Sequence, residues 1–225
     1  METLSAADVP SGTGKDADLQ PSLGACLLFC AAGAALNVFF SHAFKSILHL
    51  PLYMDTLFTI AATLYCGPFW GLGTGVVSNL LLHSIFFYGW PVYLYTLCNA
   101  ATALTTILFM RRFPEELSFS PRRTPVRTGM DRVIVLLFLS FSLCVVMSLL
   151  GGTITAGMKF FASPDAVIEE GPELPFKLTL LRRDLPLLLV EILSRIPLNI
   201  IDRLVSVFGA YGLAALLSRI QGSRP

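Results

Sequence analysis

The strongest constraint on this chain is the long stretch from Pro21 to Met110, whose only formally charged residues are Lys45 and Asp55. A water-facing surface of that length would expose large apolar patches, because too few polar side chains are present to cover it. Charged residues make up 14% of the whole chain, well below the roughly 25% that is usual in soluble domains. We therefore predict an all-α, polytopic integral membrane protein that is embedded in a lipid bilayer.

Six apolar segments approach the roughly 20 residues that a helix needs to cross the lipid. They cover about 23–42, 52–67, 70–88, 91–110, 132–156 and 197–219. The second segment is short, and it can cross only if Asp55 lies at the interface or faces protein. We expect one six-helix membrane domain, residues 21–220, between a disordered cytoplasmic tail, residues 1–20, and a short cytoplasmic tail, residues 221–225.

The predicted orientation depends on the connection between the fourth and fifth segments, a basic loop at residues 111–131. Six arginines occur between positions 111 and 132, and short loops rich in arginine stay in the cytoplasm. Both termini and the Gly67-Pro68 turn then lie inside, and residues 159–196 form an outer loop. Within that loop, residues 174–195 could be an amphipathic helix that lies on the membrane or caps a cavity.

Small residues predict a packing surface on the third segment. Gly71, Gly73, Gly75 and Ser78 leave little side chain on one side of the helix. In lipid, helices associate through such close contacts because no hydrophobic force draws them together. A neighbouring helix, from this chain or from a partner, is expected there.

Polar residues near the C-terminus recur at helical spacing. Glu191, Arg195, Asn199 and then Asp202 or Arg203 follow one another at intervals of three or four, which places them on one helix face. Charged side chains within a span are costly, so they pair internally or meet a polar ligand. Two interpretations stay open: internal pairing, such as Glu191 with Arg195, or a ligand site that opens to the outside.

Other polar residues fall in the same outer half of the predicted spans. Asn37, Asn79 and Asn99 come from three different segments, and Asp55 and His83 lie at a similar depth. An amide within a span needs a partner, so these residues predict a polar cavity, although ordinary hydrogen bonds between helices would explain each one singly. The candidate ligand-binding residues are Asn37, Asp55, Asn79, His83, Asn99, Glu191, Arg195, Asn199 and Asp202.

Catalytic and cofactor motifs are not expected in this chain. The segment SGTGK, residues 11–15, has neither the first glycine nor the final serine or threonine of a phosphate-binding loop. No arrangement of a nucleophile with a base is visible, and no two histidines have the helical spacing of metal ligands. The five cysteines lie in apolar segments and are interpreted as small core residues. We expect no cofactor, no metal, no enzymatic activity and no nucleic-acid partner.

The stretch LYMDTLFTIAATLYCGPFWGLGTGVVSNLL, residues 52–81, resembles the substrate-binding S components of energy-coupling factor (ECF) transporters. It has the aspartate, the glycine-proline turn and the glycine-rich third helix of that family. Six spans, the inner termini, the basic loop and the final span RIPLNIIDRLVSVFGAYGLAALL also agree with it. The resemblance covers most of residues 23–220.

This resemblance implies a subunit of a bacterial inner-membrane transporter that captures a vitamin or similar micronutrient from outside. Its partners would be a transmembrane coupling protein and two cytoplasmic ATPase subunits, which supply ATP hydrolysis. Family members present small residues of the first helix to the coupling protein, and Ala31, Ala32, Ala34 and Ala35 match that feature. The alternative from another class is a membrane sensory domain that binds a small ligand and is read by a partner kinase or regulator.

Overall fold

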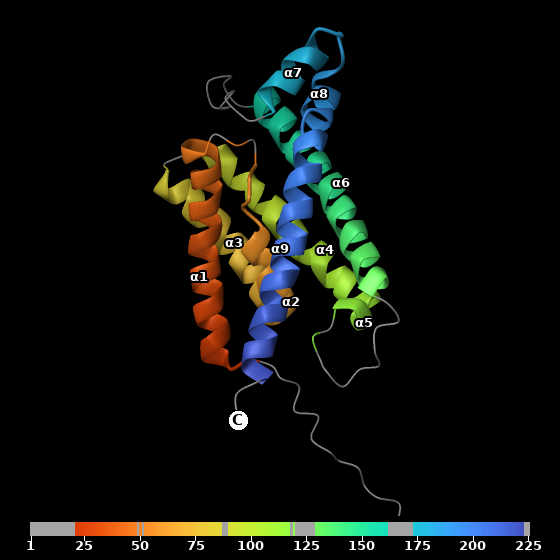
Figure 1. Ribbon diagram of the computed structural model, residues 1–225. Coiled ribbons are helices and arrows are strands. Elements are labelled where there is room, and N and C mark those ends of the chain that lie inside the picture. Colours follow the sequence, from red (N-terminus) through yellow and green to blue (C-terminus); the bar gives the residue numbers. More distant parts are fainter. Residues whose placement is uncertain are drawn as a thin grey trace, which may run out of the picture.

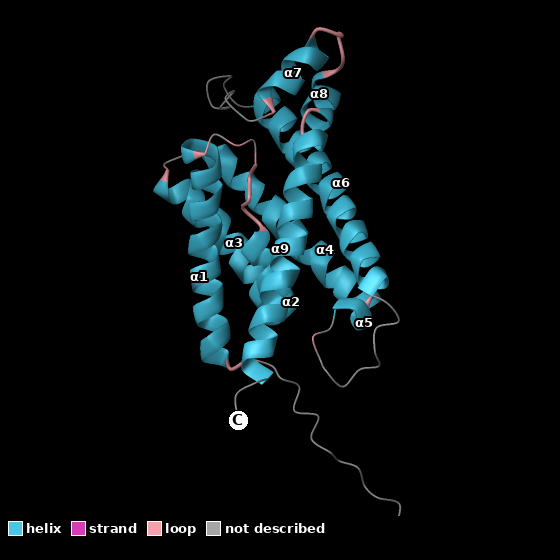
Figure 2. Ribbon diagram, in the orientation of Figure 1, coloured by secondary structure: helices cyan, strands magenta, loops and turns pink. Residues whose placement is uncertain are grey.

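The computed structural model describes residues 21–48, 50, 52–86, 90–117, 119, 129–161 and 173–222, and the regular structure in these residues is entirely helical (Figures 1 and 2). In chain order the helices are α1 Leu23–His42, the π-helical turn η1 Ala43–Ile47, α2 Leu57–Tyr65, α3 Pro68–Ile85, the 3₁₀ helix η2 Trp90–Tyr95, α4 Thr96–Arg112, α5 Pro114–Leu117, α6 Gly129–Phe161, α7 Leu174–Leu181, α8 Leu187–Leu193 and α9 Ile196–Gly222. The predicted all-α class is therefore confirmed for the described residues.

Four stretches of the described residues are long and apolar enough to cross a membrane. They are Leu23–Ile47, Val92–Arg112, Gly129–Phe161 and Leu187–Gln221, and they correspond to the first, fourth, fifth and sixth predicted spans. These four helices are compatible with a membrane-embedded protein. The predicted count of six is not reached on this measure.

The second and third predicted spans depart from expectation for different reasons. In the second, only the 9 residues of α2 are helical, and at 1.5 Å per residue they reach about 13 Å, less than half of the hydrocarbon thickness. The third is helical over the 18 residues of α3, but glycines and polar residues such as Asn79 and His83 keep its mean hydropathy below that of the four long helices.

Different connecting segments and helix ends lie at the two ends of the bundle (Figure 1). At one end, here called the α5 end, lie the start of α1, the α2–α3 turn, α5, the start of α6 and the end of α9. Contacts between Tyr65 and both Phe29 and Gln221 hold three of these parts together. The opposite end, the α7 end, carries η1, η2, α7 and α8. This grouping agrees with the predicted sidedness of the connections, whereas which end faces the cytoplasm stays a prediction.

Some predicted regions lie partly or wholly outside the described residues. The predicted N-terminal tail, residues 1–20, is wholly outside, as are residues 120–128 of the basic loop and 162–172 of the outer loop. Of the C-terminal tail, only Gln221 and Gly222 are described, and they belong to α9. The predicted amphipathic segment 174–195 forms two short helices, α7 and α8, with a turn at residues 182–186.

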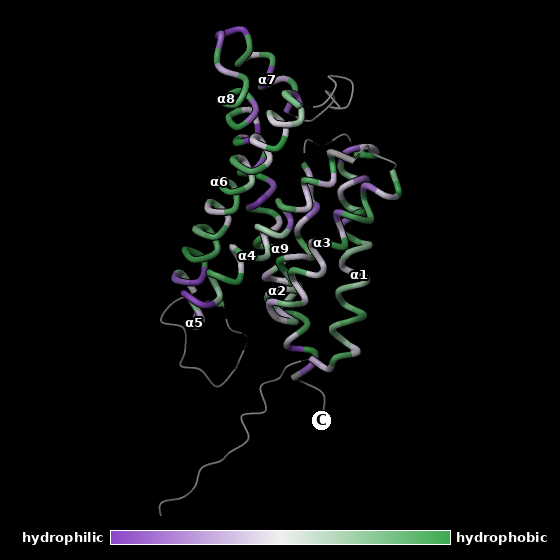
Figure 3. The backbone as a smooth tube through the Cα atoms, turned by 180° about the vertical axis from the view of Figure 1, so that it is seen from behind, coloured by the Kyte–Doolittle hydropathy of each residue, from purple (hydrophilic) through white to green (hydrophobic). Residues whose placement is uncertain are grey.

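The bundle buries many polar side chains beside a hydrophobic core of α2, α6 and α9 that includes Ile60, Leu139 and Val207. Threonine, serine and asparagine side chains of α2, α3 and α4 are buried, including Thr59, Thr63 and Thr106 at 0% exposure. Large apolar residues point outward along the long helices, among them Phe138 and Phe141 on α6. Hydrophobic residues follow the lengths of α1 and α6, and hydrophilic residues gather near α5 and at the α7–α8 turn (Figure 3). The outward-facing apolar residues of the long helices are compatible with a protein embedded in lipid.

The glycine-rich face of α3 packs against other helices of this chain. This is one of the two arrangements expected from the sequence, the other being a helix of a partner protein. A side chain at Gly71 would collide with the Cα atom of Thr63 at 2.7 Å, and one at Gly75 would come within 3.1 Å of the backbone oxygen of Asn99. The neighbours of this face are thus α2 and α4. Gly73 does not belong to it: the space around Gly73 is open, because two residues along a helix turn the side chain to the far side.

Candidate functional site

The site is built around a non-helical segment, residues 52–56, that precedes α2 and lies alongside α9 (Figure 1). Backbone in an apolar environment needs hydrogen-bond partners, and irregular backbone is tolerated only where protein supplies them. Here the Asp202 Oδ1 atom on α9 accepts hydrogen bonds from the backbone N–H groups of Tyr53, at 3.1 Å, and Met54, at 2.9 Å. Met54 is buried with a φ of 47°, a conformation that non-glycine residues rarely adopt. Asp202 therefore holds the segment in an unwound form.

Arg203 pairs with two carboxylates around this segment. Its Nη2 atom lies 2.6 Å from Asp202 Oδ2 and 3.3 Å from Asp55 Oδ1, and its Nη1 atom donates a hydrogen bond to the Thr56 hydroxyl. Arg203 and Asp202 are fully buried, whereas the Asp55 side chain is 23% exposed. We call Asp55, Thr56, Asp202 and Arg203 the segment clamp, because they fix residues 52–56 against α9.

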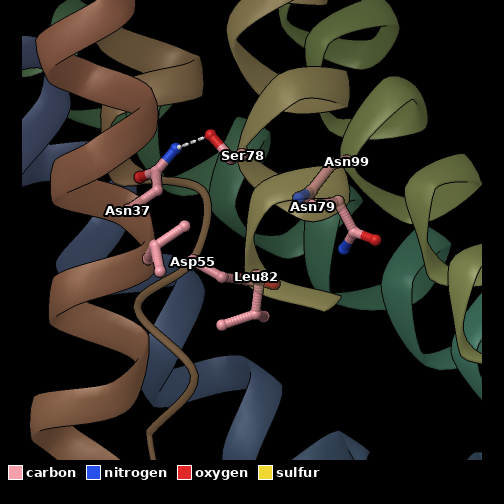
Figure 4. A pocket seen from close by; sticks show the side chains of 7 residues that line it. Asn37, Asp55, Ser78, Asn79, Leu82 and Asn99 are labelled. Carbon is pink, nitrogen blue, oxygen red and sulfur yellow. Dashed lines mark hydrogen bonds between the residues drawn. The ribbon is translucent and has the colours of Figure 1, made fainter. Parts of the chain in front are cut away.

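A small polar hollow adjoins the segment clamp (Figure 4). Its walls come from α1, the segment 52–56, α3 and α4. The lining residues are Asn37, Val38, Asp55, Ser78, Asn79, Leu82 and Asn99. In this conformation the hollow is closed, because it has no room even for a molecule the size of water.

The polar atoms of the hollow differ in how far the protein already satisfies them. Asn37 is fully engaged: its amide nitrogen donates to the Thr59 and Ser78 hydroxyls, and its oxygen accepts from the backbone N–H of Phe58. The Asn79 oxygen accepts from Thr96. By contrast, Asn99 is buried and its Oδ1 atom accepts no hydrogen bond from the described residues.

A second set of buried charges lies at the α7 end. Glu191 on α8 is fully buried between two lysines, with Lys159 at 3.2 Å and Lys177 at 2.9 Å. Arg195 lies 3.2 Å from Glu173 and donates to the Thr155 hydroxyl at 2.7 Å. We call Lys159, Glu173, Lys177, Glu191 and Arg195 the end cluster.

Tyr53 connects the end cluster with the unwound segment. Its hydroxyl donates to Glu173 Oε2 at 2.7 Å, while its backbone N–H belongs to the clamp interactions. Burial alone would raise the pKa of Glu173, but the guanidinium of Arg195 and the Tyr53 hydroxyl outweigh burial and lower the pKa below its usual value. Glu173 is therefore held as a carboxylate, and it links the α7 end to the wall of the hollow.

The structure does not bring the nine predicted ligand residues together in one place. Asn37, Asp55, Asn79 and Asn99 line the hollow, and Asp202 belongs to the segment clamp beside it. Glu191 and Arg195 are in the end cluster. Asn199 donates to Ser148 at 2.9 Å, and His83 packs edge-on against Tyr93, with ring centroids 5.6 Å apart. Neither Asn199 nor His83 lines the hollow.

Several important residues were absent from the sequence-based set. Arg203 is the cation of the segment clamp. The helical spacing of the polar stripe could not decide whether Arg203 or Asp202 was its last member. The partners of the predicted stripe were also different: Glu191 pairs with Lys159 and Lys177, not with Arg195, whose partner is Glu173. A buried carboxylate requires a cation, and that rule was the available signal for these residues. That rule does not identify which lysine, among several far apart in the sequence, pairs with a given carboxylate.

The alanines of α1 face two directions. Ala31, Ala32 and Ala35 are exposed, and Ala34 is buried within the bundle at 1% exposure. The predicted contact with a partner protein is therefore left to the three exposed alanines. A Cβ atom added at Gly33, which lies between them, would come within 3.2 Å of the Phe58 side chain. This side of α1 therefore belongs to the chain's own core.

Metal chemistry finds no support in the described ranges, in which no group of three or more histidine, cysteine or acidic side chains is placed to hold a metal ion. The residues that line the hollow include one carboxylate, Asp55, and the three amides Asn37, Asn79 and Asn99. Searches of protein family models, of curated protein sequences and of solved structures each find no significant match to this chain.

Proposed function

We propose that this protein is the substrate-capturing membrane subunit of an ECF-type uptake transporter, which binds a vitamin or similar micronutrient at the polar hollow. The observation that carries the proposal is the coincidence of that hollow with an unwound segment inside an otherwise helical bundle. Transporters commonly place their substrate sites where a membrane helix is discontinuous, because backbone and side-chain polar groups are released there for binding.

The walls of the hollow come from separate parts of the chain. Asp55 lies on the unwound segment, whereas Ser78 and Asn79 lie on α3 and Asn99 lies on α4. A change in the position of residues 52–56 would therefore alter the volume of the hollow. Because the hollow has no room for a molecule the size of water, we interpret this conformation as a closed form, which opens to admit a molecule of vitamin size.

The outward face of α1 supports the assignment of a partner. Ala31 and Ala35 are exposed at a spacing of four, which puts them on one face where another helix can approach closely. In the proposed complex this face contacts the transmembrane coupling protein, and two cytoplasmic ATPase subunits supply ATP hydrolysis. The chain itself then needs no nucleotide site.

Substitution of these alanines tests the partner contact. In the proposed complex, Ala31→Trp or Ala35→Trp prevents close helix contact, and co-purification with the coupling protein and ATPases from the native membrane is lost. The solitary protein keeps its thermal stability, because both positions face outward. Leu137→Trp, at another outward-facing site on α6, is the matched control and should leave co-purification intact. Retained association in both alanine variants would remove the assignment.

The identity of the captured molecule and of the partner separates transport from sensing. Native mass spectrometry of the gently purified protein should reveal a bound small molecule, which uptake into whole cells would then confirm as a substrate. Co-purification with a kinase or regulator in place of an ATPase pair would favour the sensory alternative, in which the same hollow is read rather than emptied.

A further inference from the structure

The α7–α8 hairpin, which we define as residues 174–193, turns its charged side inward and its apolar sides outward. Lys177 on α7 is buried and pairs with Glu191 on α8 at 2.9 Å. A helix that lies at a water surface has the opposite arrangement, with its charged residues toward the solvent. The polarity of the hairpin is therefore that of an element in an apolar medium. Its exposed apolar residues are Pro175, Phe176, Leu178, Leu181, Leu187, Leu188, Leu189 and Leu193.

The length of α6 matches the full thickness of a bilayer. This helix has 33 residues and is about 50 Å long at 1.5 Å per residue. A bilayer with its headgroup layers measures about 40–45 Å, and membrane helices are tilted by about 20° on average. If the charged start of α6 lies in one headgroup layer, its last residues, the exposed Phe160 and Phe161, lie in the other. Lys159 pairs with Glu191, so the hairpin lies at that same level.

We propose that the α7–α8 hairpin is a phospholipid-binding element. Its apolar sides contact the acyl chains, and Arg182 and Arg183 in its turn bind the phosphate groups. This inference needs neither a substrate nor a partner, so it stands or falls separately from the proposed function. It also decides between the two arrangements expected for residues 174–195, because no residue of the hairpin lines the hollow that it was expected to cap.

The turn of the hairpin carries the groups that recognise a phosphate (Figures 1 and 3). Arg182 and Arg183 are exposed, and neither forms an ion pair with a described residue. The guanidinium group presents a planar set of N–H donors that fits phosphate oxygens, and the arginine stem is apolar. Leu181 precedes the two arginines and Leu187 follows the turn, both exposed. The turn thus offers both halves of a phospholipid contact within a few residues.

The directions of the apolar side chains favour lipid over a protein partner. Leu187, Leu188 and Leu189 are consecutive, so their side chains leave α8 about 100° apart from one another. Phe176 and Leu178 diverge by about 200° around α7. A second copy of this chain or a partner protein would cover one side of the hairpin. Lipid surrounds a protruding element on all its outward sides, as this pattern requires.

Fluorescence quenching of a single tryptophan tests the acyl contact. The full-length protein with Trp70→Phe, Trp90→Phe and Leu188→Trp is placed in phosphatidylcholine vesicles. Brominated acyl chains should remove most of its fluorescence, whereas aqueous acrylamide should remove little. In the same background, Leu137→Trp on the outward face of α6 is the control for lipid contact, and Glu115→Trp on α5 is the control for water. Leu178→Trp repeats the test on α7.

Two results would overturn the acyl contact. If acrylamide quenches the hairpin tryptophans as strongly as Glu115→Trp, the hairpin lies in water. If neither quencher reaches them, protein covers the hairpin, as in a dimer of this chain. The outward positions of Leu178 and Leu188 make both variants compatible with folding, which an unchanged Tm in detergent verifies.

The phosphate contact is tested by Arg182→Gln combined with Arg183→Gln. In phosphatidylcholine nanodiscs this double variant should have a Tm about 4 °C below that of the wild type. In a maltoside detergent, which has no phosphate, the two proteins should have equal Tm values. If the arginines act only within the protein, for example on the C-terminal dipole of α7, Tm would fall equally in both media and the phosphate contact would be wrong. Stabilisation of the wild type alone by inorganic phosphate in detergent would assign the site to a free ion, which also overturns the lipid proposal.

Discussion

The end cluster and the segment clamp bury the same kinds of charged groups but use them differently. In the end cluster, each carboxylate has a cation within 3.2 Å, and the two oxygens of Glu191 meet different lysines. In the segment clamp, two carboxylates share Arg203, and the Asp55 side chain is 23% exposed. The end cluster thus has three cations for two carboxylates, whereas the segment clamp has one cation for two carboxylates.

The two sets also differ in what they hold together. A buried charge is expensive unless it is paired and hydrogen-bonded. Ion pairs in the end cluster join α6, α7 and α8 into one frame. The segment clamp fixes residues 52–56 against α9, and Tyr53, bonded to both sets, connects the two.

The largest effect is expected from Arg203→Met, which would remove the cation from the segment clamp. Asp55 and Asp202 would then face each other without compensation, and breaking such a buried pair costs about 3–5 kcal/mol. We expect a large decrease in Tm in detergent. Arg219→Met, at an exposed position near the end of α9, should change Tm little.

A double variant would sharpen this test. Asp202→Asn combined with Arg203→Met leaves one uncompensated carboxylate, Asp55, in place of the two in Arg203→Met alone, and the asparagine oxygen can still accept from the N–H groups of Tyr53 and Met54. The double variant should therefore be more stable than Arg203→Met alone, a non-additive result that measures the coupling of the two residues. Simple addition of two destabilising effects would show that the charge pair is not what holds the segment.

The sequence was sufficient to predict the helical class and four of the long helices, because their signals are local. An apolar run of 20 residues near positions 23–42 or 132–156 identifies a helix without knowledge of its neighbours. The same local rule failed at residues 52–67. There, the stability of the unwound segment depends on Asp202, a residue far away in the chain, and no local pattern contains that contact.

The candidate site was predictable to a similar extent. The amides Asn37, Asn79 and Asn99 were grouped by depth alone, and all three line one hollow. Depth could not show that Asn37 is fully bonded while Asn99 is not. It also could not assign partners to Glu191, because the choice between Arg195 and two distant lysines is decided by helix packing.

A smaller effect is expected from Glu191→Gln in the end cluster. Lys159 and Lys177 would lose their shared partner, but a lysine can move its ammonium group toward water, so we expect a loss of about 2–3 kcal/mol rather than more. Thermal unfolding in detergent measures this loss. An unchanged Tm would contradict the structural role of the end cluster.

The smallest expected effect is the pH dependence that Glu173 confers on stability. Its pKa is lowered in the folded protein, so the folded state binds a proton less readily than the unfolded state and gains stability wherever the carboxylate is charged. The contribution is fully present above the usual pKa of about 4.5 and is lost as the pH falls through the lowered value. Glu173→Gln should cost about 1–2 kcal/mol at neutral pH, and its Tm should converge with that of the wild type as the pH decreases below 4.5. If the Tm difference between the two proteins stayed constant down to acidic pH, the negative charge of Glu173 would not contribute to stability. The hydrogen bond from Tyr53 to Glu173 would then connect the end cluster to the unwound segment without help from that charge.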